Sequence, residues 1–160
     1  MTYQPIGVIH SPFTDPKDMP IQPLGARGVK GTVELGAQFE AGLKDLEGFS
    51  HIILLYHFHL SKGYSLHVVP FLDDVERGVF ATRAPRRPNP VGLSIVRLLA
   101  VSGCHLSIED VDIVDGTPLI DIKPFVPYFD HRDNASCGWL ITRLGEVHTR
   151  RADDRFSSDE

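Results

Sequence analysis

Short segments in which apolar and polar residues alternate dominate this sequence and restrict the folds open to it. In the clearest of them, Val29, Val33 and Leu35 alternate with Lys30 and Glu34, which is typical of a half-buried strand. Similar reasoning predicts strands over 6–10, 29–35, 50–60, 66–70, 79–82, 93–101, 105–114 and 119–123. Apolar residues at helical spacing predict one helix over 37–46, closed by a glycine.

Many short strands separated by turn signals predict a mainly β fold, an antiparallel sandwich or barrel with one or two short helices. The pattern has no strand–helix–strand alternation and no Gly-rich nucleotide turn, so we do not expect a Rossmann-like domain. A length of 160 residues suits one domain, which we place at 1–149, followed by a polar tail over 150–160 that we expect to fray. Because no apolar run suits a secretory leader or a membrane span, we expect a cytoplasmic protein without a membrane partner.

The segment 83–92 combines stiffness with positive charge. It contains three arginines, three prolines and Asn89. The prolines restrict the backbone, and the arginines present fork-shaped donors. Gly92 allows another group to approach the backbone closely. The net charge of −5 argues against a nucleic-acid partner, yet the stretch 77–108 contains no acidic residue. We therefore expect this loop to bind an anionic or planar group.

A second segment, 115–128, begins with an Asp-Gly-Thr-Pro sequence that by itself indicates a turn. Charged residues then surround a Pro- and aromatic-rich stretch that ends at Tyr128. Such a stretch offers an aromatic face on which a base can stack.

Three histidines lie in or just after one apolar run, at His51, His57 and His59. On a straight strand these positions share a face, so a metal site is conceivable. No acidic residue follows His57 and His59 closely, as it would in a His-x-His barrel dioxygenase, and we therefore predict no metal site. No nucleophile motif such as GxSxG is present, so hydrolase chemistry has little support.

Two long motifs resemble those of one known family. The first runs from Phe80 to Ser94 and contains Ala-Thr-Arg-Ala-Pro and Arg-Pro-Asn-Pro-Val-Gly-Leu-Ser. The second is Asp-Gly-Thr-Pro-Leu-Ile-Asp-Ile-Lys-Pro-Phe-Val-Pro-Tyr over 115–128. Together with 6–13 and 49–52 they are similar to the TsaA-like (TrmO) family, and the resemblance extends from about Ile6 to Trp139.

The resemblance implies a compact antiparallel β-barrel and a homodimer that binds S-adenosyl-L-methionine near the subunit interface. It implies methyl transfer to N6 of threonylcarbamoyladenosine, next to the anticodon of tRNA. The implied cofactor contacts are Pro20, Ile21, Gln22, His59, Leu60, Arg83, Leu93, Asp115, Gly116, Thr117 and Pro118. The implied substrate contacts are Arg86, Arg87, Asn89, Lys123 and Tyr128.

Catalysis of this kind needs no covalent nucleophile, and the residues that take part in the chemistry stay unknown at this point. A proton acceptor is conceivable, with Asp115 and Asp121 as the candidates. Many family members carry an additional C-terminal domain, whereas this sequence ends at Glu160. Two alternatives remain. The chain length and the net charge of −5 favour methyl transfer to a small molecule, and the histidine-rich strand favours a non-catalytic barrel that binds a ligand or a metal.

Overall fold

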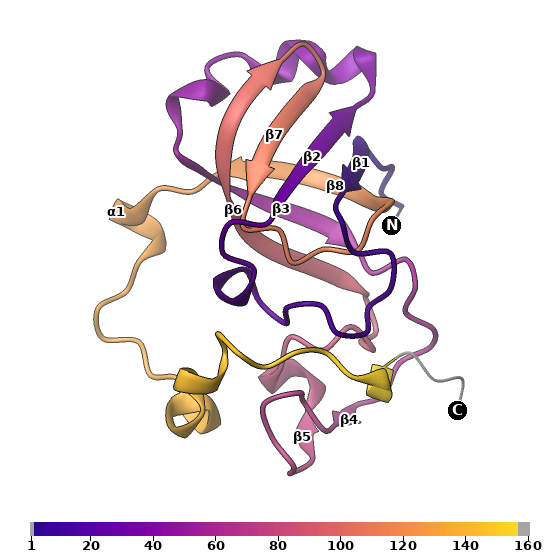
Figure 1. The fold of residues 1–160 in the computed structure, drawn as a ribbon, viewed down its shortest axis with the longest axis vertical. Helices are drawn as coiled ribbons and strands as arrows, with labels where there is room; N and C mark the ends of the chain where they lie inside the picture. Colours follow the sequence, from indigo (N-terminus) through magenta and orange to yellow (C-terminus); the bar gives the residue numbers. More distant parts are fainter. Residues whose placement is uncertain (1, 157–160) are drawn as a thin grey trace.

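The structure is a computed structural model, and it describes residues 2–156. Six strands form a closed barrel in the order β1-β2-β7-β6-β3-β8, with every neighbouring pair antiparallel (Figure 1). Their bounds are β1 Gly7–His10, β2 Lys30–Leu35, β3 His51–His57, β6 Val91–Ser102, β7 His105–Glu109 and β8 Thr117–Pro124. The predicted fold class is confirmed, and of the two β architectures the chain adopts the barrel.

Alternation along the strands fills the barrel interior. In β3 the buried positions are Ile52, Leu54 and Tyr56, which pair with Val96, Ser94 and Gly92 of β6. Side chains of successive strand residues point to opposite faces, so the even-numbered residues of both strands face inward together. Ser94 is therefore a polar residue inside an otherwise apolar wall.

Short helical turns and residues with left-handed backbone correct three predictions. The predicted helix over 37–46 is instead two 3-10 segments, η2 Ala37–Leu43 and η3 Leu46–Gly48, because Asp45 between them has a left-handed φ of 66°. The predicted strand over 79–82 is wrong, since η4 Val79–Ala81 is also a 3-10 turn. The strand predicted over 105–114 ends at Glu109, where Asp110 turns the chain with φ 68°. Two further short helices are η1 Pro23–Gly25 and α1 Pro127–Asp130.

Outside the barrel, β4 His67–Val68 pairs with β5 Arg77–Gly78, and the C-terminal segment lies beside this small sheet (Figure 1). That segment contains η5 Gly138–Thr142, η6 Leu144–Glu146 and η7 Asp154–Phe156. Trp139 Nε1 donates to the Ala81 carbonyl at 2.8 Å. We refer to residues 138–156 as the C-terminal strap.

The end of the strap is packed, so the expected fraying is wrong for residues 150–156. Ala152 is buried, its N–H donates to the Met19 carbonyl, and its carbonyl accepts from the Asp18 N–H, both at 2.9 Å. The Phe156 ring meets Phe71 edge to face at 4.9 Å. Residues 157–160 of the predicted tail lie outside the described residues. Within residues 2–156 no helix has the length and apolar character that crossing a bilayer requires.

Candidate functional site

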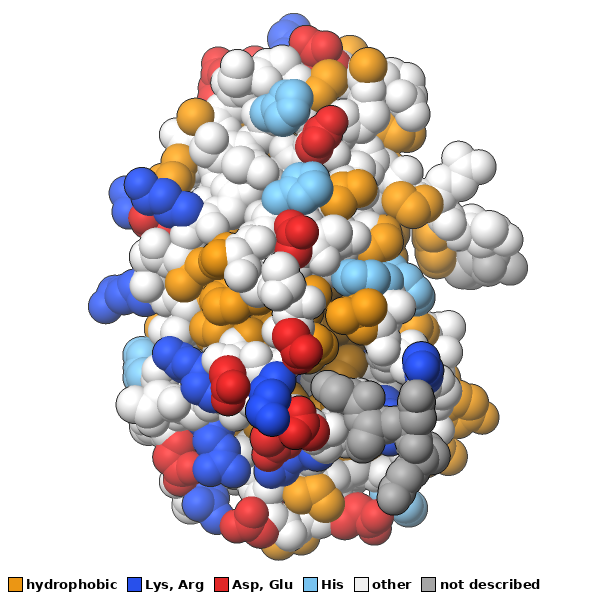
Figure 2. All heavy atoms as spheres, turned by 45° about the vertical axis from the view of Figure 1, so that its right-hand side comes forward, with side chains coloured by type: hydrophobic (Ala, Val, Ile, Leu, Met, Phe, Trp, Pro, Cys, Tyr) orange, Lys and Arg blue, Asp and Glu red, His pale blue; other side chains and the backbone are white. Residues whose placement is uncertain are grey.

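A cleft of about 1170 Å³ opens at one end of the barrel. Its walls come from the strand ends and from loops distant in sequence, and the C-terminal strap forms one side. Figure 2 shows hydrophobic side chains gathered in the middle of one face, with a cluster of basic and acidic side chains below them. Single-ligand pockets commonly measure roughly 300–1,000 Å³, so this cleft has room for more than one small molecule.

Most of the predicted cofactor residues line this cleft. They are Pro20, Ile21, Gln22, His59, Leu60, Arg83, Leu93 and Thr117. Arg83 donates from Nη1 to the Gln22 side-chain oxygen at 3.0 Å, which joins two loops separated by 61 positions. The fold thus brings together residues that four separate sequence segments contribute.

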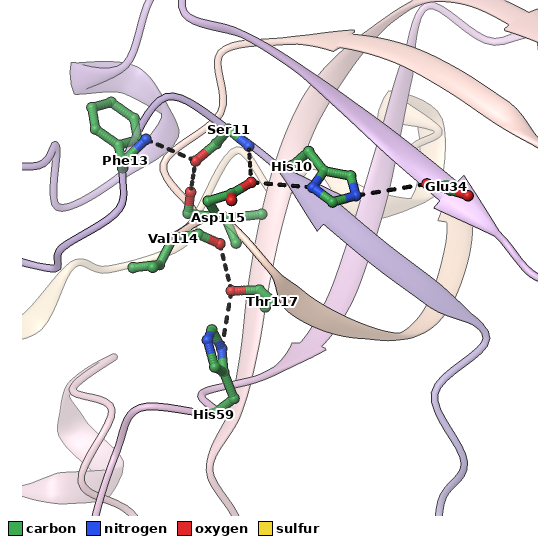
Figure 3. A network of polar contacts seen from close by, with 9 residues as sticks. His10, Ser11, Phe13, Glu34, His59, Val114, Asp115 and Thr117 are labelled. Atoms are coloured by element: carbon green, nitrogen blue, oxygen red, sulfur yellow. Dashed lines mark hydrogen bonds and ion pairs between the residues drawn. The ribbon is translucent and has the colours of Figure 1, made fainter.

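The Asp115 turn lies at the rim of the cleft rather than in its lining. Asp115 Oδ1 accepts from the Ser11 N–H at 3.1 Å and from His10 Nδ1 at 3.2 Å (Figure 3). These donors, the backbone N–H of Ser11 first, hold the pKa of Asp115 below its ordinary value, so this carboxylate is charged near neutral pH. Gly116 makes the turn with φ 75°, and Pro118 already belongs to β8.

Thr117 links the rim to the cleft (Figure 3). Its hydroxyl donates to the Val114 carbonyl at 2.6 Å and lies 3.3 Å from His59 Nδ1. A hydroxyl has one proton, so Thr117 accepts from His59, whose Nδ1 therefore carries the hydrogen. Burial, and then the neighbouring His57, lower the pKa of His59, so this ring is neutral at pH 7.

The predicted substrate residues divide into two groups. Arg87 and Asn89 line the cleft, whereas Arg86 lies outside its lining and accepts from Ser65 N through its backbone carbonyl. Lys123 pairs with Asp121 at 2.7 Å near the far end of β8, about 20 Å along the strand from Thr117. Tyr128 is 95% exposed on α1, which projects from the barrel (Figure 1). Within one chain, Lys123 and Tyr128 are therefore not brought to the cleft.

Sequence reasoning missed the floor of the cleft, where three side chains form a chain of hydrogen bonds. The Ser94 hydroxyl donates to Asp112 Oδ1 at 2.6 Å, and the Tyr56 hydroxyl lies 3.0 Å from Ser94 Oγ. Because Ser94 has one proton and gives it to Asp112, Tyr56 is the donor to Ser94. Tyr56 and Asp112 both line the cleft. The available signal was Ser94 itself, a polar residue at an inward strand position.

Burial controls the ionisation of this floor. It raises the pKa of Asp112 to about 7, although the Ser94 hydrogen bond and the charge of Arg83 oppose the shift. Burial also raises the pKa of Tyr56 far above its ordinary value, so its hydroxyl stays protonated. Asp112 is thus a carboxyl group that changes charge near neutral pH.

Gly92 has a specific reason to lack a side chain. A Cβ at this position would lie 2.2 Å from Cε2 of Tyr56, which pairs with Gly92 across β3 and β6. The group that approaches this glycine is therefore the aromatic ring of the cleft floor.

The histidines do not form a metal cluster in the part of the chain that the structure describes, where no group of three or more His, Cys, Asp or Glu side chains is suitably placed. His51 lies 2.9 Å from the Ser50 hydroxyl, and its ring meets Phe125 edge-on. His59, beyond the end of β3, is directed to Thr117 instead.

Comparison with known proteins agrees with these motifs. The sequence model of the tRNA-methyltransferase O N-terminal domain matches residues 8–131. This chain belongs to that family. The family resemblance drawn from the two motifs is therefore confirmed.

Relatives from archaea and bacteria extend the comparison. A probable S-adenosyl-L-methionine-binding protein of Pyrococcus abyssi is 56% identical over 98% of this chain and 85% of its own length. The Escherichia coli tRNA (adenine(37)-N6)-methyltransferase is 36% identical over 86% of this chain. A crystal structure of TrmO from Pseudomonas aeruginosa matches 87% of this chain with a TM-score of 0.73 and 40% identity. The chain spans less than two thirds of the length of these last two proteins, 63% and 62%.

Proposed function

We propose that this protein is a cytoplasmic S-adenosyl-L-methionine-dependent methyltransferase that acts on adenine in tRNA, at N6 of threonylcarbamoyladenosine beside the anticodon. One observation carries the proposal: residues of the family's separate motifs converge on one cleft at the end of the barrel. The names of the E. coli and P. abyssi relatives support the reaction and the cofactor respectively.

The residues of the cleft fit the chemistry of this cofactor. Apolar side chains such as Phe58 and Leu93 suit a purine, and Arg83 suits a carboxylate. The ionised carboxylate of Asp115 at the rim suits a hydroxyl or cationic group. When bound, S-adenosyl-L-methionine supplies a methyl group on a positively charged sulfur.

The residues of this chain would contribute by positioning the two reactants and by excluding water from the cleft. Methyl transfer needs the acceptor nitrogen in line with the methyl group, and orientation of two reactants can supply much of the rate enhancement. Arg87, at the cleft wall, donates to the Thr82 and Ala84 carbonyls at 3.3 and 3.5 Å and keeps its charge for an anionic substrate group. A threonyl carboxylate has the geometry that a guanidinium binds. The C-terminal strap shields one side of the cleft from solvent.

A homodimer is part of the proposal. Phe80, Leu60 and Leu93 belong to the cleft lining yet are 76%, 49% and 42% exposed. Apolar side chains concentrated at one mouth are typical of an interaction surface. The molar mass in solution, measured by light scattering, should be that of two chains, and a monomer at all concentrations would contradict this part.

A small-molecule acceptor is the second candidate, favoured by the net charge of −5. Several arginines near the cleft are neutralised within the chain, for example Arg77 by Asp73 at 2.7 Å and Arg155 by Asp153 at 2.6 Å. Binding to RNA phosphates becomes weaker with added salt, whereas binding of a small acceptor need not, so salt dependence separates the two candidates.

The decisive experiment incubates the protein with methyl-labelled cofactor and tRNA that carries threonylcarbamoyladenosine. We expect label in that nucleoside after digestion, and none with tRNA that lacks the modification. Cofactor binding without any transfer to the modified tRNA would reject the RNA substrate.

Replacing Arg83 by alanine tests whether this residue contacts the cofactor. We expect binding weaker by about 1–3 kcal/mol if a charge-assisted hydrogen bond to the cofactor is lost. Titration calorimetry with S-adenosyl-L-methionine measures the effect. Arg97→Ala, which removes an arginine paired with Glu109 on the barrel, is the matched control and should bind normally. Equal affinity of both variants would remove Arg83 from the cofactor site.

A further inference from the structure

The cleft floor contains a carboxyl group that the proposed function has not used. Asp112 follows β7, lines the cleft, and is held by Ser94 at 2.6 Å. Ser94 in turn accepts from Tyr56, whose ring is fixed against Gly92 on one side and meets Phe58 edge to face at 5.5 Å. Two neighbouring strands thus hold the carboxylate in one orientation, which a purely solvated Asp would not require.

We propose that Asp112 is a catalytic residue, the proton acceptor for the nitrogen that receives the methyl group. The inference rests on the proposed function. In the step, the lone pair of the acceptor nitrogen forms a bond to the methyl carbon while the methyl–sulfur bond breaks. The electron pair of the broken bond goes to sulfur, which becomes a neutral thioether. The N6 proton passes to the Asp112 carboxylate and leaves for solvent when the product departs.

Asp112 suits this role better than the other acidic residues near or on the motifs. Asp115 accepts hydrogen bonds from Ser11 and His10 on its Oδ1 at the rim, and its lowered pKa makes it a weaker base. Asp121 is paired with Lys123 away from the cleft lining. A general base works best when its pKa is close to the working pH, and burial brings the pKa of Asp112 to about 7.

The groups that face Asp112 determine how it titrates. Tyr56 from β3 and Ser94 from β6 belong to its hydrogen-bond chain, and Arg83 from the loop before β6 adds a positive charge. Tyr56 stays neutral because burial raises its pKa. Asp112 is therefore the group among these whose charge changes near pH 7.

The test measures single-turnover methyl transfer to threonylcarbamoyladenosine tRNA between pH 5.5 and 8.5. For the unaltered protein we expect the rate to rise about tenfold per pH unit at low pH and to level off above about pH 7. Asp112→Asn keeps the shape of the side chain but cannot accept the proton. It should be slower by about 10²–10⁴-fold at pH 7, lose the pH dependence, and bind the cofactor within about threefold of normal.

Three variants sharpen the result. Asp112→Glu restores a carboxylate and should recover part of the rate together with its pH dependence. Asp110→Asn makes the same change of charge two positions away, outside the cleft, and should behave as the unaltered protein, since an amide oxygen can still accept from Gly28 N. Ser94→Ala removes the donor to ionised Asp112 and should move the midpoint of the rate profile to higher pH.

Several outcomes would overturn the role of Asp112. One is a methyl-transfer rate of Asp112→Asn that has the normal value and the normal pH dependence. Another is a loss of rate in Asp112→Asn that weaker cofactor binding explains by itself. The third is a pH–rate profile of Ser94→Ala whose midpoint is unchanged. Thermal unfolding and cofactor affinity identify a variant that fails to fold, in which case Ser94→Ala decides. If the unaltered protein transfers no methyl group to this RNA, both the proposed function and the role of Asp112 are rejected. If the protein is active and the Asp112→Asn variant is equally active, only the role of Asp112 is rejected.

Discussion

Two carboxyl groups three positions apart, Asp112 and Asp115, behave in opposite ways because one lies in the floor of the cleft and the other at its rim. At the floor, burial outweighs the hydrogen bond that Ser94 donates and raises the pKa of Asp112 to about 7. At the rim, the hydrogen bond from the Ser11 N–H, together with His10 and the Gly116 N–H, outweighs desolvation and lowers the pKa of Asp115. The floor is suited to exchanging a proton, and the rim to holding a permanent negative charge.

The difference arises from the end of β7 and the start of β8. The chain leaves β7 at Glu109, crosses the floor at Asp112, and emerges at the Asp115–Gly116 turn before entering β8. Residues spaced closely in sequence therefore face different solvent conditions. Distance along the chain is a poor guide to electrostatic surroundings where a connection crosses a barrel end.

The largest expected effect is on stability as a function of pH. Because the pKa of Asp112 is higher in the folded than in the unfolded protein, its contribution to stability is complete below about pH 4 and is lost as the pH rises through 7. At 1.36 kcal/mol per pKa unit, and discounting for access of water to the cleft, the loss is on the order of 2–4 kcal/mol. Denaturant unfolding at pH 5 and pH 8 should show this loss in the unaltered protein and not in Asp112→Asn. Equal pH dependence of the two would mean that the floor is solvated like the rim.

A smaller effect is expected from Gly92→Ala, which disturbs the floor without touching a charge. The new methyl group would meet the Tyr56 ring at 2.2 Å, and overpacking of this kind costs about 1–3 kcal/mol. Displacing Tyr56 would also break its hydrogen bond to Ser94. The free energy of unfolding measures the effect, with Gly42→Ala, where no atom lies within 4 Å of the new Cβ, as the control. An unchanged free energy of unfolding in Gly92→Ala would show that the floor is not rigid.

The smallest effect is expected at the rim. Asp115→Asn keeps an acceptor for Ser11 N and loses the negative charge that accepts from Nδ1 of His10, a side chain that is 45% exposed. Exposed charged contacts are worth about 0.2–1 kcal/mol. The loss should be complete above about pH 4 and should disappear as the pH falls through the lowered pKa of folded Asp115, because protonation of Asp115 removes the same charge. Thermal unfolding at pH 3 and pH 7 checks this. A loss as large as that at the floor would remove the contrast between the two sites.

Much of the fold and part of the site could be predicted from the residues. The alternation over 29–35 and the apolar run of β3 gave correct strands because burial of one face imposes a period of two. The helix over 37–46 failed because the left-handed backbone at Asp45 divides it, and local spacing does not reveal such a break. Of the substrate residues, Arg87 and Asn89 reached the cleft, but Lys123 did not, since a motif position carries no information on which end of a strand it occupies.

By itself, the sequence determined the class of fold, the family and the loops that meet at the cleft, because strand periodicity and long motifs are properties of local order. The tertiary structure decided which polar residues are buried. Ser94 is a strand residue like its neighbours until β3 places Tyr56 beside it, and Asp112 is an ordinary aspartate until the barrel end removes part of the water around it. Desolvation depends on every surrounding atom, and those atoms come from segments that only folding brings together.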